Sequence, residues 1–226
     1  MMSKRFKNLP KDTLLITPEV IEKLIPIVKK NCTTKFDESI DVAFCLNLKK
    51  KKEEISLRTS VKLPNGNGKK IKVAVLCEES KTKEAKDAGA DIVGSDNLIN
   101  DITAGKLGFD KLVSTPSMMS KMGKLGKILG PKGLMPNPKL GTVTNNVSSI
   151  VKSLKSGQIE IKSDDDGNIA ASIGKKSFSD IKIIENFNAF IQTIQKEKPS
   201  KIKGDFILSS FLTSTMGISY KLKLRA

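Results

Sequence analysis

The hydrophobic pattern of the chain changes twice, and this change limits the fold more than any other feature. At 40–48, and again from residue 158 onwards, apolar and polar residues alternate, as they do in a strand with one buried face. Between these parts, residues 71–77 (IKVAVLC) form an apolar run that is typical of a strand covered on both faces. The two ends therefore favour an α+β structure, whereas the middle favours an α/β structure.

The middle of the chain is predicted to alternate strands with helices. The expected elements after the strand at 71–77 are a helix at 81–88, a strand at 91–93, a helix at 97–103 and a strand at 110–114. A further helix is predicted over 117–129, because four apolar residues recur there at spacings of four, three and four: Met118, Met122, Leu125 and Leu129. This alternation predicts a small parallel α/β unit.

The terminal parts are predicted to combine strands with a few helices. The sequence at 17–19 indicates a helix start, with Thr17 as the N-cap and Pro18 at the first helical position. A second strand is expected near 55–63, after a solvated turn at 49–54. Strands at 158–162 and 168–173 are expected to form a hairpin around the turn at 164–167.

Two more helices have recognisable ends. One is capped by Asn145 or Asn146 and closed by Gly157. The other spans 180–196, with Ser179 as its N-cap and four residues predicted to point inward: Ile184, Phe187, Ile191 and Ile194. Two strands are expected to complete the chain, the last with apolar residues at alternate positions from 218 to 224.

An inserted domain is the most economical topology for this pattern. The cluster of Pro, Asn and Gly at 64–68 marks the first boundary. We predict that residues 1–64 and 159–226 form one split α+β domain and that residues 65–158 form an inserted α/β domain. The chain then crosses between the domains at two adjacent places, which predicts a hinge.

The charge of the chain favours a polyanion as its partner. The formal net charge is +16, from 40 Lys and Arg against 24 Asp and Glu. No apolar run approaches the roughly 18 residues that would span a bilayer, so no membrane partner is expected. Residues 111–158 contain eight lysines and no acid, which indicates a surface that meets phosphates. A lysine-rich solvated face remains the alternative for this segment.

Several classes of site are disfavoured by the residues present. The chain has no His, so the Ser–His and Cys–His pairs of hydrolases are absent. Cys32, Cys45 and Cys77 form no C-x-x-C pair and are expected to be reduced thiols. The turn at 164–166 lacks the spacing of a calcium loop, so neither a metal nor a cofactor is expected.

A nucleotide-binding loop is also poorly supported. If Lys132 were the lysine of a P-loop, Pro131 would stand where the second glycine must be, and Gly133 would replace Ser or Thr. A nucleotide-using enzyme in the α/β insert remains an alternative, which saturable nucleotide binding would reveal. Aromatic residues make up only 4% of the chain, which disfavours binding of unpaired strands and favours folded RNA.

The segment 126–143 (GKILGPKGLMPNPKLGTV) is rich in Gly, Pro and Lys, so it is predicted to be a shaped, positively charged loop. With the residues before it, 123–144 closely resembles the hallmark segment of the L1 family of large-subunit ribosomal proteins (bacterial type). Further segments resemble family motifs in family order: KFDESIDV at 35–42, LPNG at 63–66, GADIVG at 89–94 and STMG at 214–217. The resemblance covers nearly the whole chain.

This resemblance implies a non-enzymatic RNA-binding protein. The fold it implies is a split α+β domain that carries the main ribosomal RNA site, with an inserted Rossmann-like α/β domain on a two-strand hinge. The hinge residues would be Pro64, Asn65, Gly66, Gly157 and Gln158. The start of the chain lacks the pattern of a signal or transit peptide, so we expect a ribosomal location in a bacterial cytoplasm or in an organelle that encodes the protein.

The implied partners are nucleic acids and other ribosomal components, with no homo-oligomer expected. Family members bind a folded stalk of large-subunit ribosomal RNA beside the tRNA exit site, and they assist the movement and release of deacylated tRNA. Bacterial members can also bind their own messenger RNA and repress its translation. A free RNA chaperone that acts away from the ribosome remains an alternative.

The resemblance also implies site residues. The ribosomal RNA contacts would be Lys35, Phe36, Glu38, Ser39, Thr213, Ser214, Thr215, Met216 and Gly217, with Lys162 and Asp164 in a hairpin nearby. Glu38 and the hydroxyls would bond ribose and base edges, whereas Phe36 and Met216 would give apolar contacts or pack in the core. A secondary contact with RNA or tRNA is expected from Lys121, Lys124, Lys127, Lys132 and Lys139.

Overall fold

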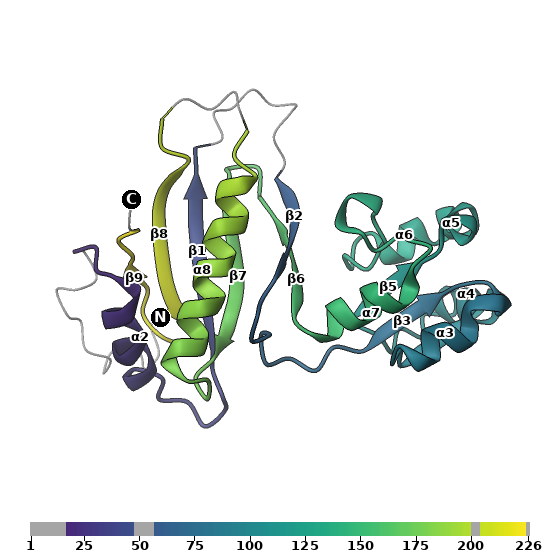
Figure 1. The fold of residues 1–226 in the computed structure, drawn as a ribbon, viewed down its shortest axis with the longest axis horizontal. Helices are drawn as coiled ribbons and strands as arrows, with labels where there is room; N and C mark the ends of the chain where they lie inside the picture. The colour runs from purple at the N-terminus through teal and green to yellow at the C-terminus, as the bar shows by residue number, and fades with distance from the viewer. Residues whose placement is uncertain (1–16, 48–56, 200–203, 225–226) are drawn as a thin grey trace. The chain divides into compact units, whose positions relative to one another are not determined.

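The computed structural model describes residues 17–47, 57–199 and 204–224 (Figure 1). The chain forms two compact units: unit 1 is Met1–Gly68 with Ile159–Ala226, and unit 2 is Lys69–Gln158. Antiparallel pairing occurs in unit 1 and parallel pairing in unit 2, so the predicted combination of α+β and α/β structure is confirmed. The turn predicted at 49–54 lies outside the described residues.

The main sheet of unit 1 is antiparallel and has the strand order β7-β1-β8-β9. Its strands are β1 (Ser39–Leu46), β7 (Asn168–Lys175), β8 (Ile207–Ser214) and β9 (Tyr220–Lys221). Alternate side chains of β1, from Ile40 to Leu46, are buried, as the alternation predicts. The first and last thirds of the chain therefore share one sheet.

Helices α2 (Ile21–Lys30) and α8 (Asp180–Lys196) pack against this sheet, and α8 lies across β1 and β7 (Figure 1). The Phe190 ring of α8 stacks on the Phe44 ring of β1, with 5.5 Å between the ring centroids. The predicted inward positions Ile184 and Ile191 are only partly buried, whereas Ile183 and Phe190 are fully buried. Ile184 and Ile191 nevertheless pack against the core as predicted, while Ile183 and Phe190 are buried more deeply.

Two predictions for unit 1 are wrong because distant segments pair with each other. Helix α2 begins at Ile21, with Val20 as the N-cap, because Glu19 instead pairs with the last strand. The Glu19 N–H donates to the Lys221 carbonyl at 3.2 Å, and the Lys223 N–H donates to the Glu19 carbonyl at 2.8 Å. The predicted hairpin is also replaced, since β6 (Gln158–Lys162) pairs with β2 (Arg58–Lys62) and β7 pairs with β1.

Unit 2 has a parallel sheet of strand order β4-β3-β5. Its strands are β3 (Val73–Leu76), β4 (Ile92–Gly94) and β5 (Lys111–Ser114), and every residue of β3 is buried as predicted. The connecting elements are η2 (Glu79–Lys81), α3 (Thr82–Asp87), α4 (Asp96–Thr103) and α7 (Val147–Lys155). Two apolar clusters cover the sheet, one of them built with α4 and the other with α3 and α7.

The single helix predicted over 117–129 is broken into three pieces. These are α5 (Pro116–Met122), η3 (Gly123–Leu125) and α6 (Gly126–Leu129). Gly123 and Gly126 lie at the two junctions, and glycine weakens a helix at such positions. The four apolar residues of the predicted face are nevertheless all buried in one cluster. Within the described ranges, no helix is both long and apolar enough to cross a bilayer.

Candidate nucleic-acid interface

The two segments that carry most of the predicted RNA contacts meet at one end of the main sheet of unit 1. Ile40 of β1 pairs with Ser214 of β8, so the loop before β1 lies beside the turn after β8. The Thr215 N–H donates to the Ser39 carbonyl at 3.1 Å, and the Ser39 N–H donates to Thr215 Oγ1 at 2.9 Å. The structure thus brings residues 35–39 and 213–217 together.

Glu38 links these two segments through its side chain, which is fully buried at 0% exposure. Its Oε1 accepts hydrogen bonds from the Thr34 hydroxyl at 2.7 Å and the Thr34 N–H at 3.3 Å. Its Oε2 accepts from the Ser214 hydroxyl at 2.7 Å and the Met216 N–H at 3.2 Å. The expectation that Glu38 bonds ribose or base edges is therefore wrong, because no part of its side chain is accessible.

The Glu38 carboxylate is stabilised in its charged form. Burial is the largest influence and raises the pKa of Glu38, but the hydrogen bonds from Ser214, Thr34 and Met216 outweigh it. The pKa of Glu38 consequently lies below its ordinary value. An ionised carboxylate is an acceptor only, which suits a site where four donors converge.

The loop before β1 is held at further points. The Asp37 carboxylate accepts from the Ser177 hydroxyl at 2.7 Å and from the Ser177 N–H at 3.1 Å. The Lys176 N–H donates to the Glu38 carbonyl at 2.8 Å, and its ammonium donates to the Cys32 carbonyl at 2.7 Å. These bonds fix the backbone on both sides of Lys35 and Phe36. Burial of the nearby Cys32 thiol raises its pKa.

Phe36 and Met216 present large apolar side chains to solvent beside this buried network. Their exposed fractions are 54% and 49%. Core packing, which was the alternative interpretation of both residues, is therefore wrong. Two other large apolar residues are comparably exposed in the described part of the chain, Ile181 and Leu208. Exposed apolar side chains on a fixed backbone are typical of a binding surface.

Gly217 is required by close approach rather than by an unusual backbone angle. A Cβ atom at this position would lie 2.3 Å from Ser214 Oγ, the same hydroxyl that donates to Glu38. The Gly217 N–H also donates to the Ser214 carbonyl at 3.2 Å. Any side chain at residue 217 would therefore disturb the hydroxyl that connects the turn to Glu38.

Lys162 and Asp164 lie at the other end of the sheet. Ser39 of β1 pairs with Lys175, whereas Cys45 pairs with Asn168 directly after the turn that holds Asp164. Six residue steps along β1 correspond to about 20 Å. The two residues are therefore not adjacent to Ser39 and Thr215, contrary to the expectation.

The Asp164 carboxylate is directed at its own turn. Its Oδ1 accepts from the Asn168 N–H at 2.6 Å and from the Asp166 N–H at 3.1 Å, and its Oδ2 accepts from Asn168 Nδ2 at 3.0 Å. The hydrogen bonds from Asn168 are the main reason why the pKa of Asp164 is lowered. Asp164 thus shapes the turn, while Lys162 is exposed at the end of β6.

A row of half-buried side chains connects the two ends of the sheet on the face opposite α2 and α8. Three cross-strand pairs of β1 and β8 form this row: Asp41 with Thr213, Ala43 with Phe211, and Cys45 with Ser209. Of these six residues, only Thr213 was predicted as a site residue. The alternation in β1 indicates Asp41, Ala43 and Cys45, because every second residue of such a strand must point away from the core.

The lysines of unit 2 that were predicted to contact RNA or tRNA differ in their surroundings. Lys121 is paired with Asp96 at 2.8 Å, and Lys155 is paired with Asp91 at 3.1 Å. The other predicted contact lysines are exposed, and the described residues include no carboxylate paired with them: Lys124, Lys127, Lys132 and Lys139. These four lysines remain available to an anionic partner.

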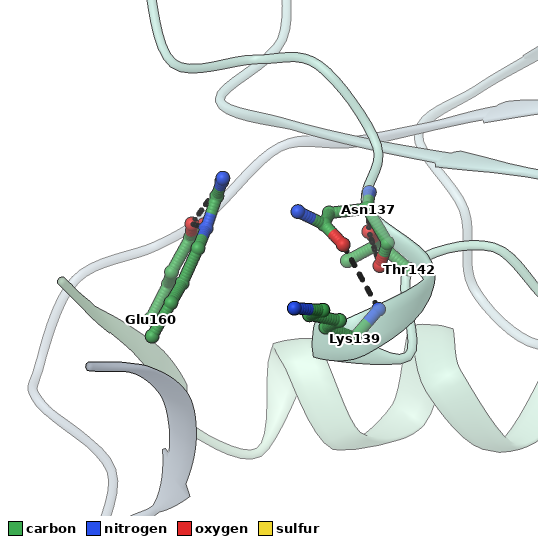
Figure 2. Close-up of polar contacts among 5 residues, drawn as sticks. Asn137, Lys139, Thr142 and Glu160 are labelled. Atoms are coloured by element: carbon green, nitrogen blue, oxygen red, sulfur yellow. Dashed lines mark hydrogen bonds and ion pairs between the residues drawn. The ribbon is translucent and has the colours of Figure 1, made fainter. Parts of the chain in front are cut away.

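The loop at 126–143 is held in shape by its own polar groups. The Asn137 N–H donates to Thr142 Oγ1 at 2.7 Å, and the Lys139 N–H donates to Asn137 Oδ1 at 2.9 Å (Figure 2). Pro138–Leu140 forms the short helix η4, which Gly141 ends with a φ of +73°. Glycine is required at this position because its backbone is left-handed.

The predicted hinge residues Asn65 and Gly66 are bonded to α8 within unit 1. The Asn186 side chain is fully buried and accepts from the Asn65 N–H at 3.0 Å. Its Nδ2 donates to the Gly66 carbonyl at 2.8 Å and to the Ile173 carbonyl at 2.7 Å. On the paired strands β2 and β6, Arg58 Nη2 contacts Glu160 Oε1 at 2.6 Å. Glu160 is labelled in Figure 2.

The remaining predicted hinge residues surround the two crossings. Pro64 is exposed just before Asn65, and Gly157 has a φ of +104° just before Gln158 begins β6.

The described residues contain no group of three His, Cys, Asp or Glu side chains arranged to hold a metal ion.

Comparison with known proteins extends over both units. The sequence matches the model of the ribosomal protein L1p/L10e family at residues 28–218. It is 60% identical over 225 residues to a Pelagibacter ubique (strain HTCC1062) protein named large ribosomal subunit protein uL1, covering 99% of this chain and 98% of that protein. Proteins of the same name from Rickettsia peacockii (strain Rustic) and Rickettsia conorii (strain ATCC VR-613 / Malish 7) are 44% identical over 213 residues, covering 94% of this chain and 87% of each.

Proposed function

The chain belongs to the ribosomal protein L1p/L10e family, and from this membership we propose that it is a structural constituent of the large ribosomal subunit that binds ribosomal RNA. The family resemblance of the motif at 123–144 is thereby confirmed. The net charge of +16 supports a polyanionic partner, because each phosphate that a lysine neutralises releases a counterion.

The principal RNA surface is the end of the unit 1 sheet where residues 35–39 meet residues 213–217. The observation that carries this assignment is the exposure of Phe36 and Met216 beside the buried Glu38 network. Two apolar side chains on fixed backbone can pack on riboses or on unstacked bases. Lys35 lies next to them and supplies a charge for phosphate, and the partner is the folded stalk of the large-subunit RNA.

The RNA extends from this end along the face of the sheet opposite α2 and α8. The row from Asp41 and Thr213 to Cys45 and Ser209 leads toward the turn at 164–167, near the exposed Lys162. A sheet face about 20 Å long matches a helical segment of folded RNA better than a single nucleotide. Lys162 would then meet a phosphate that is remote from the principal contact.

The exposed lysines of unit 2 provide a secondary contact. Lys124, Lys127, Lys132 and Lys139 are held on a shaped loop and short helices, without carboxylates paired to them in the described structure. The partner of this surface is the tRNA in the exit site, whose movement and release the protein assists. The principal RNA surface of unit 1 also binds a segment of the protein's own messenger RNA that folds like the ribosomal RNA stalk. By this binding the protein represses translation of that messenger RNA.

The proposal is tested by measuring the affinity of the full-length protein for a transcript of the large-subunit RNA stalk. Met216→Ala should weaken binding by about 1–3 kcal/mol, as expected for the loss of a specific contact. Leu208→Ala is the matched control, because Leu208 is equally apolar and exposed but lies near the start of β8. Equal effects of the two substitutions, or equal affinity for an unrelated folded RNA, would contradict the assignment.

A second experiment separates a subunit constituent from a free RNA chaperone. The protein should sediment with large subunits in high salt, because a large surface with apolar contacts is screened less than a purely ionic one. Complete dissociation from the subunits at moderate salt would favour a transient role away from the ribosome.

A further inference from the structure

Glu38 lies at the centre of the principal RNA surface, yet its side chain is fully buried and cannot touch a ligand. Its two oxygens accept four hydrogen bonds, two from Thr34 and one each from Ser214 and Met216. Thr34 precedes the exposed Phe36 by two residues, and the Met216 bond is at the exposed residue itself. One carboxylate therefore fixes the backbone below both apolar contacts.

The chemistry of the four donors requires a carboxylate at this position. The hydroxyls of Thr34 and Ser214 can rotate, but the N–H groups of Thr34 and Met216 are donors only. They approach different oxygens, Oε1 and Oε2. A glutamine provides one oxygen and one NH₂ group, so it can satisfy only one of these two N–H groups and would direct a donor at the other.

Electrostatics gives the opposite expectation for the removal of this charge. A buried negative charge next to a surface that binds phosphates repels the ligand, so its removal alone should strengthen binding or leave it unchanged. A role in fixing the two segments instead predicts weaker binding, because freed segments lose conformational entropy when they bind. The sign of the change therefore distinguishes the two roles.

We propose that Glu38 is a positioning residue of the RNA surface, whose ionised carboxylate joins the segment before β1 to the turn after β8 and so holds Phe36 and Met216 in the binding arrangement. This role rests on the proposed function. Glu38 makes no contact with RNA. Its negative charge repels the RNA phosphates, while its hydrogen bonds hold Phe36 and Met216 in place.

The decisive variant is Glu38→Gln in the full-length protein, with Glu185→Gln as the matched control. Glu185 is exposed on α8, so its substitution removes the same charge from the same unit. With a transcript of the ribosomal RNA stalk, Glu38→Gln should weaken binding about tenfold or more, and Glu185→Gln should leave binding unchanged or slightly tighter. The salt dependence of binding should be the same for both, because neither variant removes a phosphate contact.

Amide hydrogen exchange of the free protein provides a readout that general destabilisation would not reproduce. In Glu38→Gln, the N–H of Thr34 or of Met216 should lose protection, while the central amides of β1 and β8 should keep theirs. If Glu38→Gln does not fold, Thr34→Val removes one hydroxyl donor, retains the N–H, and should weaken binding by a smaller factor.

Binding of Glu38→Gln that is as tight as that of the wild type, or tightened equally with Glu185→Gln, would overturn the positioning role and leave the proposed function intact. Unchanged binding of Thr34→Val would overturn it in the same way if Glu38→Gln is unfolded. Failure of the wild-type protein to bind the transcript would instead contradict the proposed function, and with it the purpose assigned to Glu38.

Discussion

Ser39 and Thr215 are 176 residues apart in the sequence, yet the Ser39 N–H donates to Thr215 Oγ1 at 2.9 Å and the Thr215 N–H donates to the Ser39 carbonyl at 3.1 Å. The pair closes the end of the β1 and β8 ladder, directly beside the Glu38 network. The candidate RNA surface therefore exists only when the two ends of the chain are folded together.

Thr215→Ala removes the acceptor of the Ser39 N–H and one exposed hydroxyl of the RNA surface. We expect RNA affinity to fall by about 1–3 kcal/mol, which is typical for the loss of a specific contact. Thr103→Ala is the control, because the Thr103 hydroxyl is exposed in unit 2 and bonds only its own helix, at the Ile99 carbonyl. Quantitative binding assays with the stalk transcript compare the two variants. An effect of Thr103→Ala as large as that of Thr215→Ala would contradict the prediction.

Gly217→Ala places a Cβ atom 2.3 Å from Ser214 Oγ, so the turn or the hydroxyl must shift. Overpacking of this kind costs about 1–3 kcal/mol, and we expect both the free energy of unfolding and RNA affinity to decrease. Gly123→Ala is the matched control, since its Cβ meets no atom within 4 Å and its backbone is helical. Urea unfolding should show no loss for Gly123→Ala; a loss equal to that of Gly217→Ala would contradict the steric explanation.

Asn186→Ala removes the buried amide that bonds the Asn65 N–H and the carbonyls of Gly66 and Ile173. Each buried polar group left without a partner costs about 1–3 kcal/mol, so unfolding should become easier by about 2 kcal/mol or more. Asn188→Ala on the exposed side of the same helix is the control. Equal stability of the two variants in chemical denaturation would show that the amide contributes little.

Stability should depend on pH through Glu38. Its pKa is lowered in the folded protein from an ordinary value of 4.5, so the folded state favours the charged form. The contribution to stability is therefore complete above the unfolded-state pKa and is lost as the pH falls through the folded-state pKa. Unfolding by urea, followed from about pH 6 to about pH 3, should show a shallower loss in Glu38→Gln than in the wild type. Identical slopes would refute this assignment.

The lysines of unit 2 should differ in their effect on the salt dependence of RNA binding. Lys132→Ala removes an exposed lysine that pairs with no carboxylate among the described residues, so the slope of log K against log salt should decrease by about one. Lys121→Ala removes a lysine that is already paired with Asp96, so its effect should be smaller. Titrations with exit-site tRNA and with stalk RNA at several salt concentrations measure both slopes. A larger effect of Lys121→Ala would contradict the prediction.

Local patterns in the sequence predicted the strands well because burial imposes a period of two. Every second residue of β1 is buried as the alternation predicts, and β3 is buried throughout as its apolar run predicts. Hydrophobic periodicity predicted the helices less well than the strands. The apolar face of 117–129 is buried, but two glycines break the helix there, and periodicity alone does not register their conformational freedom.

Long-range pairing explains what could not be predicted. The family resemblance implied that Glu38 contacts RNA, and the sequence does not reveal that Ser214 and Met216 donate to its carboxylate. The family resemblance implied that Lys162 and Asp164 lie near this site, and no short segment of the sequence encodes the register of β7 on β1 that places them elsewhere. A charged residue in a loop can be a buried acceptor or an exposed ligand, and only its distant neighbours decide between them.

A footprint on total large-subunit ribosomal RNA tests the central claim most directly. At an ionic strength of about 0.15 M and a protein concentration near the wild-type Kd, the full-length protein should protect one folded segment of this RNA from hydroxyl radicals, and Met216→Ala should weaken that protection while Leu208→Ala preserves it. Diffuse protection that follows net charge, or a Met216→Ala footprint identical to that of the wild type, would contradict the account.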